Sequence, residues 1–107
     1  MEQLSPVDLK AWLDDPERPK PLLLDVREPR EFEICHIDGA QLMPMSSVPA
    51  RAAELPRDGE IVVICHHGGR SFQVAMFLQQ HGFSRLYNLN GGVEGWALQV
   101  DRTMARY

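Results

Sequence analysis

Cysteine is scarce in this chain of 107 residues, which contains only Cys35 and Cys65. Two cysteines do not make the dense disulfide framework of a small secreted domain. An excess of basic residues is also missing, since 11 Lys and Arg stand against 15 Asp and Glu, for a formal net charge of −4. This balance argues against nucleic acid or an anionic membrane surface as a partner, because both are bound by a basic face.

Long apolar runs are absent as well. No stretch approaches the roughly 20 apolar residues of a membrane-spanning helix, and the first residues alternate polar and apolar without a signal-peptide pattern. We therefore expect a cytoplasmic protein with reduced thiols and no membrane partner. Metal-ligand spacings such as CxxC or HxxxH are missing too, so the sequence predicts neither a metal site nor a cofactor.

The pattern that is present alternates short apolar runs with helical stretches. Hydrophobic residues make up 44% of the chain, enough for a single domain over residues 1–107 with its own core. The predicted strands are 3–4, 22–24, 41–43, 61–64 and 86–89. The predicted helices are 5–13, 30–34, a segment from Ser46 or Ser47 to Leu55, 71–81, and a short one after Gly92. This alternation predicts an α/β domain with a mostly parallel sheet.

The most informative segment is the strand 61–64 with the Cys-His-His-Gly-Gly-Arg-Ser loop and the helix that follow it. In open α/β sheets, ligands bind beyond the carboxyl ends of strands, where Cys65 lies. The paired glycines Gly68 and Gly69 allow a tight loop whose N–H groups point inward as an anion nest. The next helix N-terminus and Arg70 add positive charge.

A thiolate of Cys65 is stabilised in such a loop, which makes it a better nucleophile. The same loop suits a persulfide, or a sulfonate or thiosulfonate substrate. The candidate substrate-binding residues are His66, His67, Gly68, Gly69, Arg70 and Ser71. The alternative is an inert thiol at a strand end, but cysteine, two glycines, arginine and a helix start within seven residues favour the catalytic interpretation.

Three motifs together resemble the rhodanese-homology domain over nearly the whole chain. The first comprises Leu23 to Glu28, Glu31-Phe32 and His36 to Ala40; the second is the loop Cys65–Ser71; the third is Tyr87 to Val93 with Trp96. The resemblance implies a rhodanese-like three-layer fold with a central, mostly parallel five-stranded sheet flanked by helices. It also implies sulfur transfer through a persulfide on Cys65.

The activity implied by this resemblance moves sulfane sulfur from thiosulfate or a persulfide donor to a thiol or cyanide. The partners would be a small anionic sulfur donor and a protein sulfur donor or acceptor. The alternative is a sulfur-relay or protein-interaction module with little activity on thiosulfate. An inactive regulatory domain is disfavoured because Cys65 is present.

Two features distinguish this chain from its look-alikes. Cys35 stands where the family commonly has glycine, so it is either a small replacement or a second thiol that resolves the Cys65 persulfide; we favour the first. Related phosphatases have five residues between cysteine and arginine, whereas four separate Cys65 from Arg70. The smaller loop suits a sulfur atom better than a phosphate.

Other polar residues have structural interpretations. His66 and His67 could donate protons, but we expect them to contribute mainly backbone donors. We expect Asp25 and Arg27 to form an ion pair or to bond loop backbone, and His36 to have a structural role.

Overall fold

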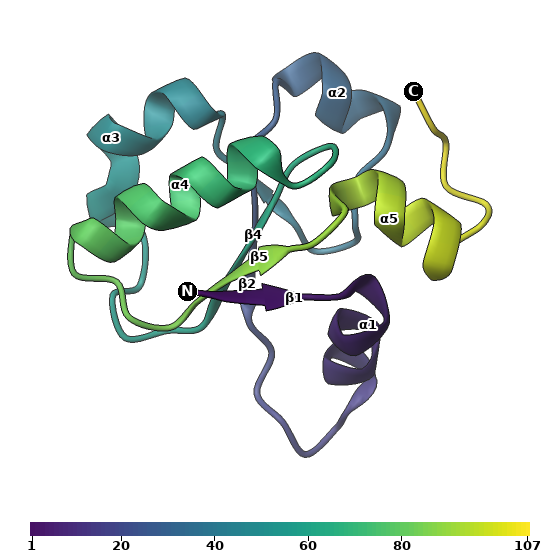
Figure 1. The fold of residues 1–107 in the computed structure, drawn as a ribbon, viewed down its shortest axis with the longest axis horizontal. Coiled ribbons are helices and arrows are strands. Elements are labelled where there is room, and N and C mark those ends of the chain that lie inside the picture. The colour runs from purple at the N-terminus through teal and green to yellow at the C-terminus, as the bar shows by residue number, and fades with distance from the viewer.

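The computed structural model describes residues 1–107 and contains five parallel strands flanked by helices (Figure 1). The strands are β1 (Glu2–Leu4), β2 (Leu22–Asp25), β3 (Gln41–Leu42), β4 (Ile61–Ile64) and β5 (Leu86–Leu89). The helices are α1 (Pro6–Asp14), α2 (Pro29–Ile34), α3 (Val48–Arg51), α4 (Gly69–Gln80) and α5 (Gly92–Gln99). The sheet order is β1-β5-β4-β2-β3, and every neighbouring pair is parallel, which confirms the predicted α/β class.

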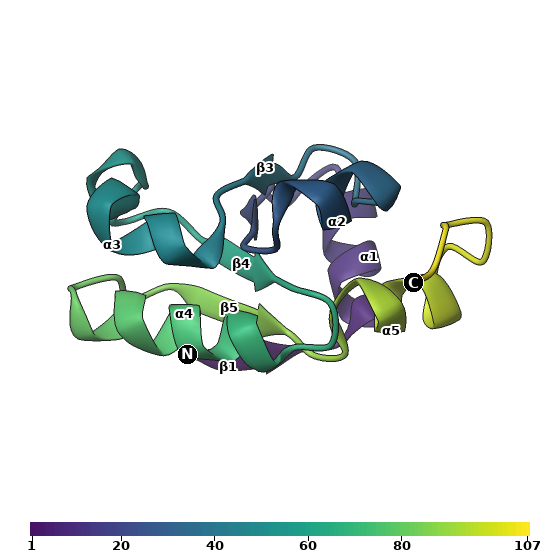
Figure 2. The same cartoon turned by 90° about the horizontal axis from the view of Figure 1, so that it is seen from above.

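The central strand β4 is buried on both faces of the sheet. Ile61 and Val63 pack into the cluster formed with α3 and α4, whereas Val62 and Ile64 pack into the cluster formed with α1 and α5. Figure 1 shows α4 above the central strands and α1 below them, and Figure 2 shows from above that α4 runs along β5 while α5 lies beyond the ends of the strands. Each such Val or Ile contributes roughly 1.5–3 kcal/mol through burial, so the core fixes β4 and hence the residue that follows it.

The helices that follow β4 and β5 leave toward opposite faces of the sheet. Val74 and Leu78 of α4 belong to one core cluster, and Val93 and Trp96 of α5 belong to the other. Since β4 and β5 are neighbours, the loops after them diverge at the carboxyl edge of the sheet. Such a divergence opens the crevice in which α/β proteins bind ligands, and Cys65 is the first residue beyond β4.

The predicted helix from Ser46 or Ser47 to Leu55 is wrong as a single helix. The segment consists of a 3₁₀ turn, Met45–Ser47, the short helix α3 and a second 3₁₀ turn, Ala52–Glu54. Pro49 lies in the first turn of α3, a position where a helix tolerates proline, and the α-helical pattern ends at Arg51. The Ser47 hydroxyl donates to the Pro44 carbonyl, at 2.7 Å, instead of capping a helix.

The other elements lie close to their predicted positions, with one shift that affects the site. Helix α4 begins at Gly69 rather than Ser71, because Gly68 makes the turn into the helix with φ of 108°. The helix ends at Gln80, shortly before Gly82, which has φ of 93°. None of the helices combines the length and the apolar composition needed to span a membrane.

Candidate active site

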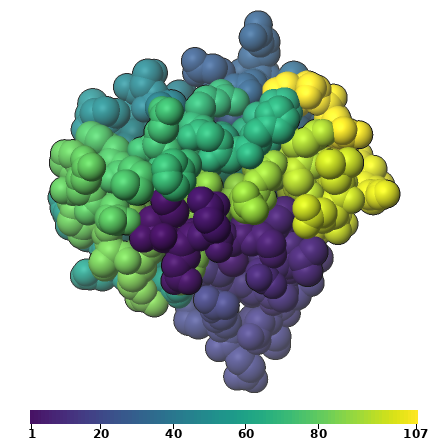
Figure 3. Space-filling view, viewed as in Figure 1, coloured from purple at the N-terminus to yellow at the C-terminus, as the bar shows by residue number.

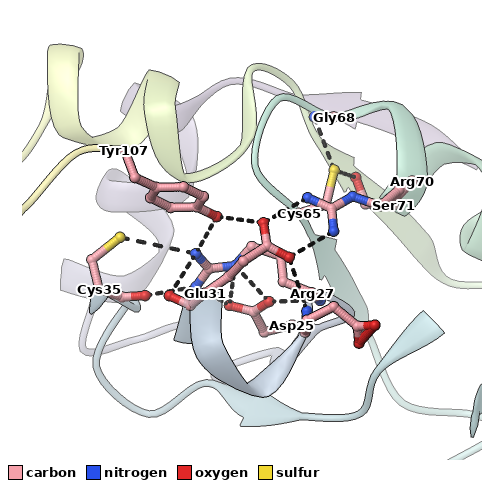
Figure 4. Close-up of polar contacts among 10 residues, drawn as sticks. Asp25, Arg27, Glu31, Cys35, Cys65, Gly68, Arg70, Ser71 and Tyr107 are labelled. Carbon is pink, nitrogen blue, oxygen red and sulfur yellow. Dashed lines mark hydrogen bonds and ion pairs between the residues drawn. The ribbon is translucent and has the colours of Figure 1, made fainter. Parts of the chain in front are cut away.

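The Cys65 sulfur lies at the N-terminus of α4 and accepts two hydrogen bonds (Figure 4). The Gly68 N–H donates from 3.0 Å and the Ser71 hydroxyl from 3.3 Å. Cys65 is only 1% exposed, so water screens these interactions weakly. The two donors and the positive end of the α4 dipole together stabilise negative charge on the sulfur.

Asn88 of β5 holds the loop in this shape from the neighbouring strand. Its amide nitrogen donates to the Gly68 carbonyl at 3.2 Å, and its carbonyl oxygen accepts from the Ser71 hydroxyl. A hydroxyl has a single hydrogen, so Ser71 shares it between Asn88 and the Cys65 sulfur. Asn88 therefore holds the Gly68 carbonyl and the Ser71 hydroxyl in position, and it competes with the sulfur for the hydroxyl hydrogen.

The N-terminus of α5 binds the outward-facing carbonyls of the same loop. The Val93 N–H donates to the Cys65 carbonyl at 2.9 Å, and the Glu94 N–H donates to the His66 carbonyl at 3.1 Å. Gly92 permits this contact, since its φ is 59° and a Cβ there would overlap both carbonyl oxygens. These contacts fix the loop in the conformation in which the Gly68 N–H faces the sulfur.

Arg70 is bound to a carboxylate of the chain itself. Its Nη1 and Nη2 donate to the two oxygens of Glu31 in α2 at 2.8 and 2.9 Å. The Arg70 guanidinium holds the pKa of Glu31 well below its usual range, and Glu31 in turn raises the pKa of Arg70. Both groups therefore stay charged, as a pair without net charge, across the physiological range.

A chain of polar contacts connects this pair to the buried end of β2. Arg27 and Asp25, both with fully buried side chains, form the expected ion pair at 2.7 Å. Arg27 also donates to the Cys35 carbonyl at 2.7 Å and to the Tyr107 hydroxyl at 2.8 Å. That hydroxyl donates to Glu31 at 2.8 Å. Burial is the main cause that raises the pKa of Tyr107 to about 12, so the phenol stays protonated and able to donate.

The two loop histidines form an aromatic stack with Tyr107 rather than contacts to the sulfur. The ring of His66 lies 3.9 Å from both the His67 ring and the Tyr107 ring, centroid to centroid. Figure 3 shows the C-terminal residues, in yellow, against the loop after β4 and against α5. Burial, and then the neighbouring His67, lower the pKa of His66, so its ring is neutral at neutral pH.

Cys35 lies apart from this arrangement. It packs in the core cluster with α1 and α5, whereas Cys65 packs in the cluster with α3 and α4. Both thiols are free, and the Cys35 sulfur is 3.9 Å from Arg27 Nη1. His36 also has a local contact, since its Nδ1 lies 2.9 Å from the Phe32 carbonyl.

The six predicted binding residues surround Cys65 in different ways. Gly68 and Ser71 contact the sulfur, Gly69 and Arg70 form the first turn of α4, and His66 and His67 line the outer side of the loop. Sequence reasoning missed the roles of Glu31, Asn88 and Tyr107. Glu31 and Asn88 lie inside recognised motifs, but nothing in the sequence indicated their partners, which are 39 and 17 residues away.

Comparisons with known proteins agree with this geometry. The family model described as "Rhodanese-like domain" matches residues 5–99, so the chain belongs to the rhodanese-like domain family. The probable adenylyltransferase/sulfurtransferase MoeZ of Mycobacterium tuberculosis is 40% identical over 97% of this chain, which spans only 26% of that protein. Thiosulfate sulfurtransferase GlpE of Tolumonas auensis is 28% identical and covers 90% of this chain and 91% of its own length.

A solved structure has the same fold. The rhodanese-related protein of Thermoplasma volcanium superimposes with a TM-score of 0.83 at 29% identity, covering 94% of each chain. The family and its relatives support sulfur transfer as the general class of chemistry for this site.

Proposed function

We propose that this chain is a sulfurtransferase that carries sulfane sulfur as a persulfide on Cys65. The observation that supports it best is the buried sulfur held between the Gly68 N–H and the Ser71 hydroxyl at the start of α4. A persulfide extends the side chain by one anionic sulfur, which such donors stabilise. The proposed setting is a reducing cytoplasm, where free thiols persist.

In the first step the Cys65 thiolate attacks the outer sulfur of the donor. With thiosulfate, a new S–S bond forms at Cys65, the S–S bond of thiosulfate breaks, and sulfite leaves with the electron pair. The total charge stays the same, because one thiolate and one dianion become one persulfide anion and one sulfite dianion. The Gly68 and Ser71 donors and the α4 dipole stabilise the new persulfide.

In the second step an acceptor takes the outer sulfur. Cyanide attacks it to give thiocyanate, or a thiolate attacks it to give a new persulfide, and Cys65 leaves as the thiolate. The two steps form a double displacement with a covalent intermediate, in which no net oxidation occurs. Protein thiols and protein persulfides are the proposed cellular acceptors and donors.

A sulfur-relay module is the second candidate function. Two observations favour it: Glu31 neutralises the only arginine of the loop, and the relative MoeZ is nearly four times as long as the chain it matches. A relay module would accept sulfur from a protein persulfide and react poorly with thiosulfate. Comparing the rates at which the two kinds of donor load Cys65 separates the candidates.

Thiocyanate formation from thiosulfate and cyanide tests the transfer activity. We expect turnover with the wild type and none with Cys65→Ser, since the serine hydroxyl is not ionised at neutral pH and cannot hold a persulfide. Circular dichroism of the variant checks that it is folded. Full activity of Cys65→Ser would contradict the proposal.

A further inference from the structure

The ion pair between Glu31 and Arg70 changes what the loop offers to an anion. Arg70 is the only arginine or lysine in the loop Cys65–Ser71, and its single ion pair is the two-pronged one with Glu31. A guanidinium has five N–H donors, so two are used and three remain. An incoming ligand therefore still finds hydrogen-bond donors on Arg70, but it meets no net positive charge.

A second carboxylate, that of Glu28, lies in the surface hollow beside Arg70. A hollow next to the loop is lined by Val26, Glu28, Met45, Ser46 and Arg70. Glu28 is exposed there and forms no ion pair, whereas Glu31 is only 14% exposed and stays bound to Arg70. The two carboxylates in this region outnumber the one guanidinium.

The titratable groups bonded to Glu31 or stacked on its partners do not offset this. Arg27 is committed to Asp25, and Tyr107 is a neutral phenol that donates to Glu31. The His66 ring stacks on Tyr107 and is neutral at neutral pH. A dianion near Cys65 is therefore attracted less strongly than by an unpaired arginine, because Glu31 on the far side of the ion pair repels it, and a like charge placed close to a ligand site is a common means of rejecting a ligand.

We propose that Glu31 is a specificity-determining residue that selects the sulfur donor by charge, favouring persulfides over the thiosulfate dianion. This inference rests on the proposed function, because it presupposes that Cys65 accepts sulfane sulfur. A persulfide R–S–SH or R–S–S⁻ carries at most one negative charge on its sulfurs. It accepts hydrogen bonds from the Gly68 N–H and the free donors of Arg70, and it meets at most half the repulsion from Glu31 that the thiosulfate dianion meets.

The chemical step is the same for the preferred donor. The Cys65 thiolate attacks the outer sulfur of R–S–SH, a new S–S bond forms at Cys65, and the original S–S bond breaks. The thiolate R–S⁻ leaves with the electron pair and takes up the proton of the persulfide as R–SH. The products are the Cys65 persulfide anion and a free thiol, so atoms, charge and oxidation state balance.

The test measures how fast each donor loads Cys65, by rapid quenching and intact mass spectrometry at several donor concentrations. The two probes are thiosulfate and the persulfide of 2-mercaptoethanol. The variant is Glu31→Gln, whose amide oxygen can still accept from Arg70 while the charge is gone. The matched control is Glu33→Gln, which removes the same charge from an exposed position of the same helix, without a hydrogen bond to Arg70.

We expect the wild type to react faster with the persulfide than with thiosulfate. Removing one unit charge close to the ligand changes an electrostatic interaction enough for Glu31→Gln to raise the thiosulfate rate roughly ten-fold. The persulfide rate rises by at most about three-fold, because a monoanion feels half the interaction energy of a dianion. Glu33→Gln leaves both rates near those of the wild type. If Glu31→Gln does not fold, Glu31→Ala replaces it in the test. This variant loses the charge and the hydrogen bonds together, and we expect it to shift the ratio of the two rates in the same direction.

Several results would overturn the inference. The first is that the wild type reacts faster with thiosulfate than with the persulfide. The second is that Glu31→Gln and Glu31→Ala leave the ratio of the thiosulfate rate to the persulfide rate unchanged. The third is that Glu33→Gln shifts this ratio as much as Glu31→Gln does. An equal loss of both rates in Glu31→Gln would assign Glu31 a purely structural role. Failure of both donors to load the wild type is a different result, because it contradicts the proposed function itself.

Discussion

At the scale of single residues, the chemistry depends on what faces one sulfur atom. Two donors reach the Cys65 sulfur, and both come from residues within six positions of it. The full charges nearby, on Arg70 and Glu31, cancel as a pair. Under the proposed function, backbone and hydroxyl donors, rather than a free cation, would therefore dominate the stabilisation of the Cys65 persulfide.

His66 tests whether a side chain beside Cys65 acts as a proton donor. Burial and then His67 lower its pKa, so the ring is neutral at pH 7, and it donates no hydrogen bond to the sulfur. We expect His66→Gln to change the rate of thiocyanate formation less than about three-fold, whereas loss of a general acid costs about a hundred-fold or more. We also expect the pH profile between pH 5.5 and 7.5 to be the same in both proteins. A loss of that larger size would contradict this view of His66.

At the scale of secondary-structure elements, the loop is held by the helices around it. The N-terminus of α5 binds two of its carbonyls, and α2 binds Arg70 at the start of α4. The geometry of the sulfur site therefore depends on contacts between elements that are distant in the sequence.

Gly92 tests the contact between α5 and the loop. In Gly92→Ala the new Cβ overlaps the carbonyl oxygens of Cys65 and His66 at a positive φ, so α5 has to move away. We expect the free energy of unfolding to fall by roughly 3 kcal/mol or more, because overpacking and backbone strain act together.

Gly69→Ala is the matched control for this change. A Cβ at Gly69 meets no atom within 4 Å, and the residue has an ordinary helical backbone. We expect unchanged stability or a gain of up to about 1 kcal/mol, since alanine favours the helix. Urea unfolding of both variants measures the difference, and equal losses of stability would contradict the steric explanation.

The ion pair between α2 and α4 predicts a pH dependence of stability. The pKa of Glu31 is lower in the folded protein than its usual value of 4.5, chiefly through Arg70. A depressed carboxyl pKa stabilises the fold above the usual value, and this stabilisation is lost as the pH falls toward the folded pKa.

Urea unfolding of the wild type and Glu31→Gln at several pH values measures this contribution. The Arg70 side chain is 38% exposed, so solvent screening limits the expected difference at pH 7 to about 1 kcal/mol. We expect the difference to begin to shrink as the pH drops below 4.5 and to keep shrinking down to the lowest pH at which the protein stays folded, because the folded pKa of Glu31 lies far below its usual value. A difference that stays constant over this range would contradict the electrostatic origin.

At the scale of the whole molecule, the sheet separates the two thiols. Cys65 belongs to the core cluster on one face and Cys35 to the cluster on the other. Both are buried and free, so they form no disulfide with each other. This arrangement favours a packing role for Cys35 over the resolving role that the sequence left open.

We accordingly expect Cys35→Ala to retain transfer activity. The variant keeps the Cys35 carbonyl that accepts from Arg27, and it loses only the buried sulfur. Its free energy of unfolding should fall by about 1 kcal/mol, as for removal of a small buried group. Thiocyanate formation and urea unfolding measure the two effects, and loss of activity in a folded Cys35→Ala protein would support a resolving thiol instead.

The sequence predicted most of the architecture because local patterns determine it. The β-branched run 61–64, the apolar run 22–24 and the Ser5 cap each give a strand or helix where expected. The segment 45–54 was mispredicted as one helix, whereas one α-helical turn there is flanked by two 3₁₀ turns, whose residue pattern resembles that of an α-helix.

Only the part of the site that lies in the loop Cys65–Ser71 could be predicted from the sequence. The position of Cys65 and the turn at Gly68 follow from local residue types. The partners of that loop come from elsewhere: Glu31 from α2, Asn88 from β5 and Tyr107 from the C-terminal segment. Their contacts depend on sheet order and helix placement, so no spacing in the sequence could indicate that Arg70 is neutralised.

The most direct measurement of persulfide transfer is intact mass spectrometry of the wild type, Cys65→Ser and Cys35→Ala after incubation with thiosulfate or with a small persulfide. We predict a reductant-reversible gain of one sulfur, about 32 Da, on the wild type and Cys35→Ala, and none on Cys65→Ser. The same gain on Cys65→Ser, or no gain on the wild type with either donor, would contradict a Cys65 persulfide carrier.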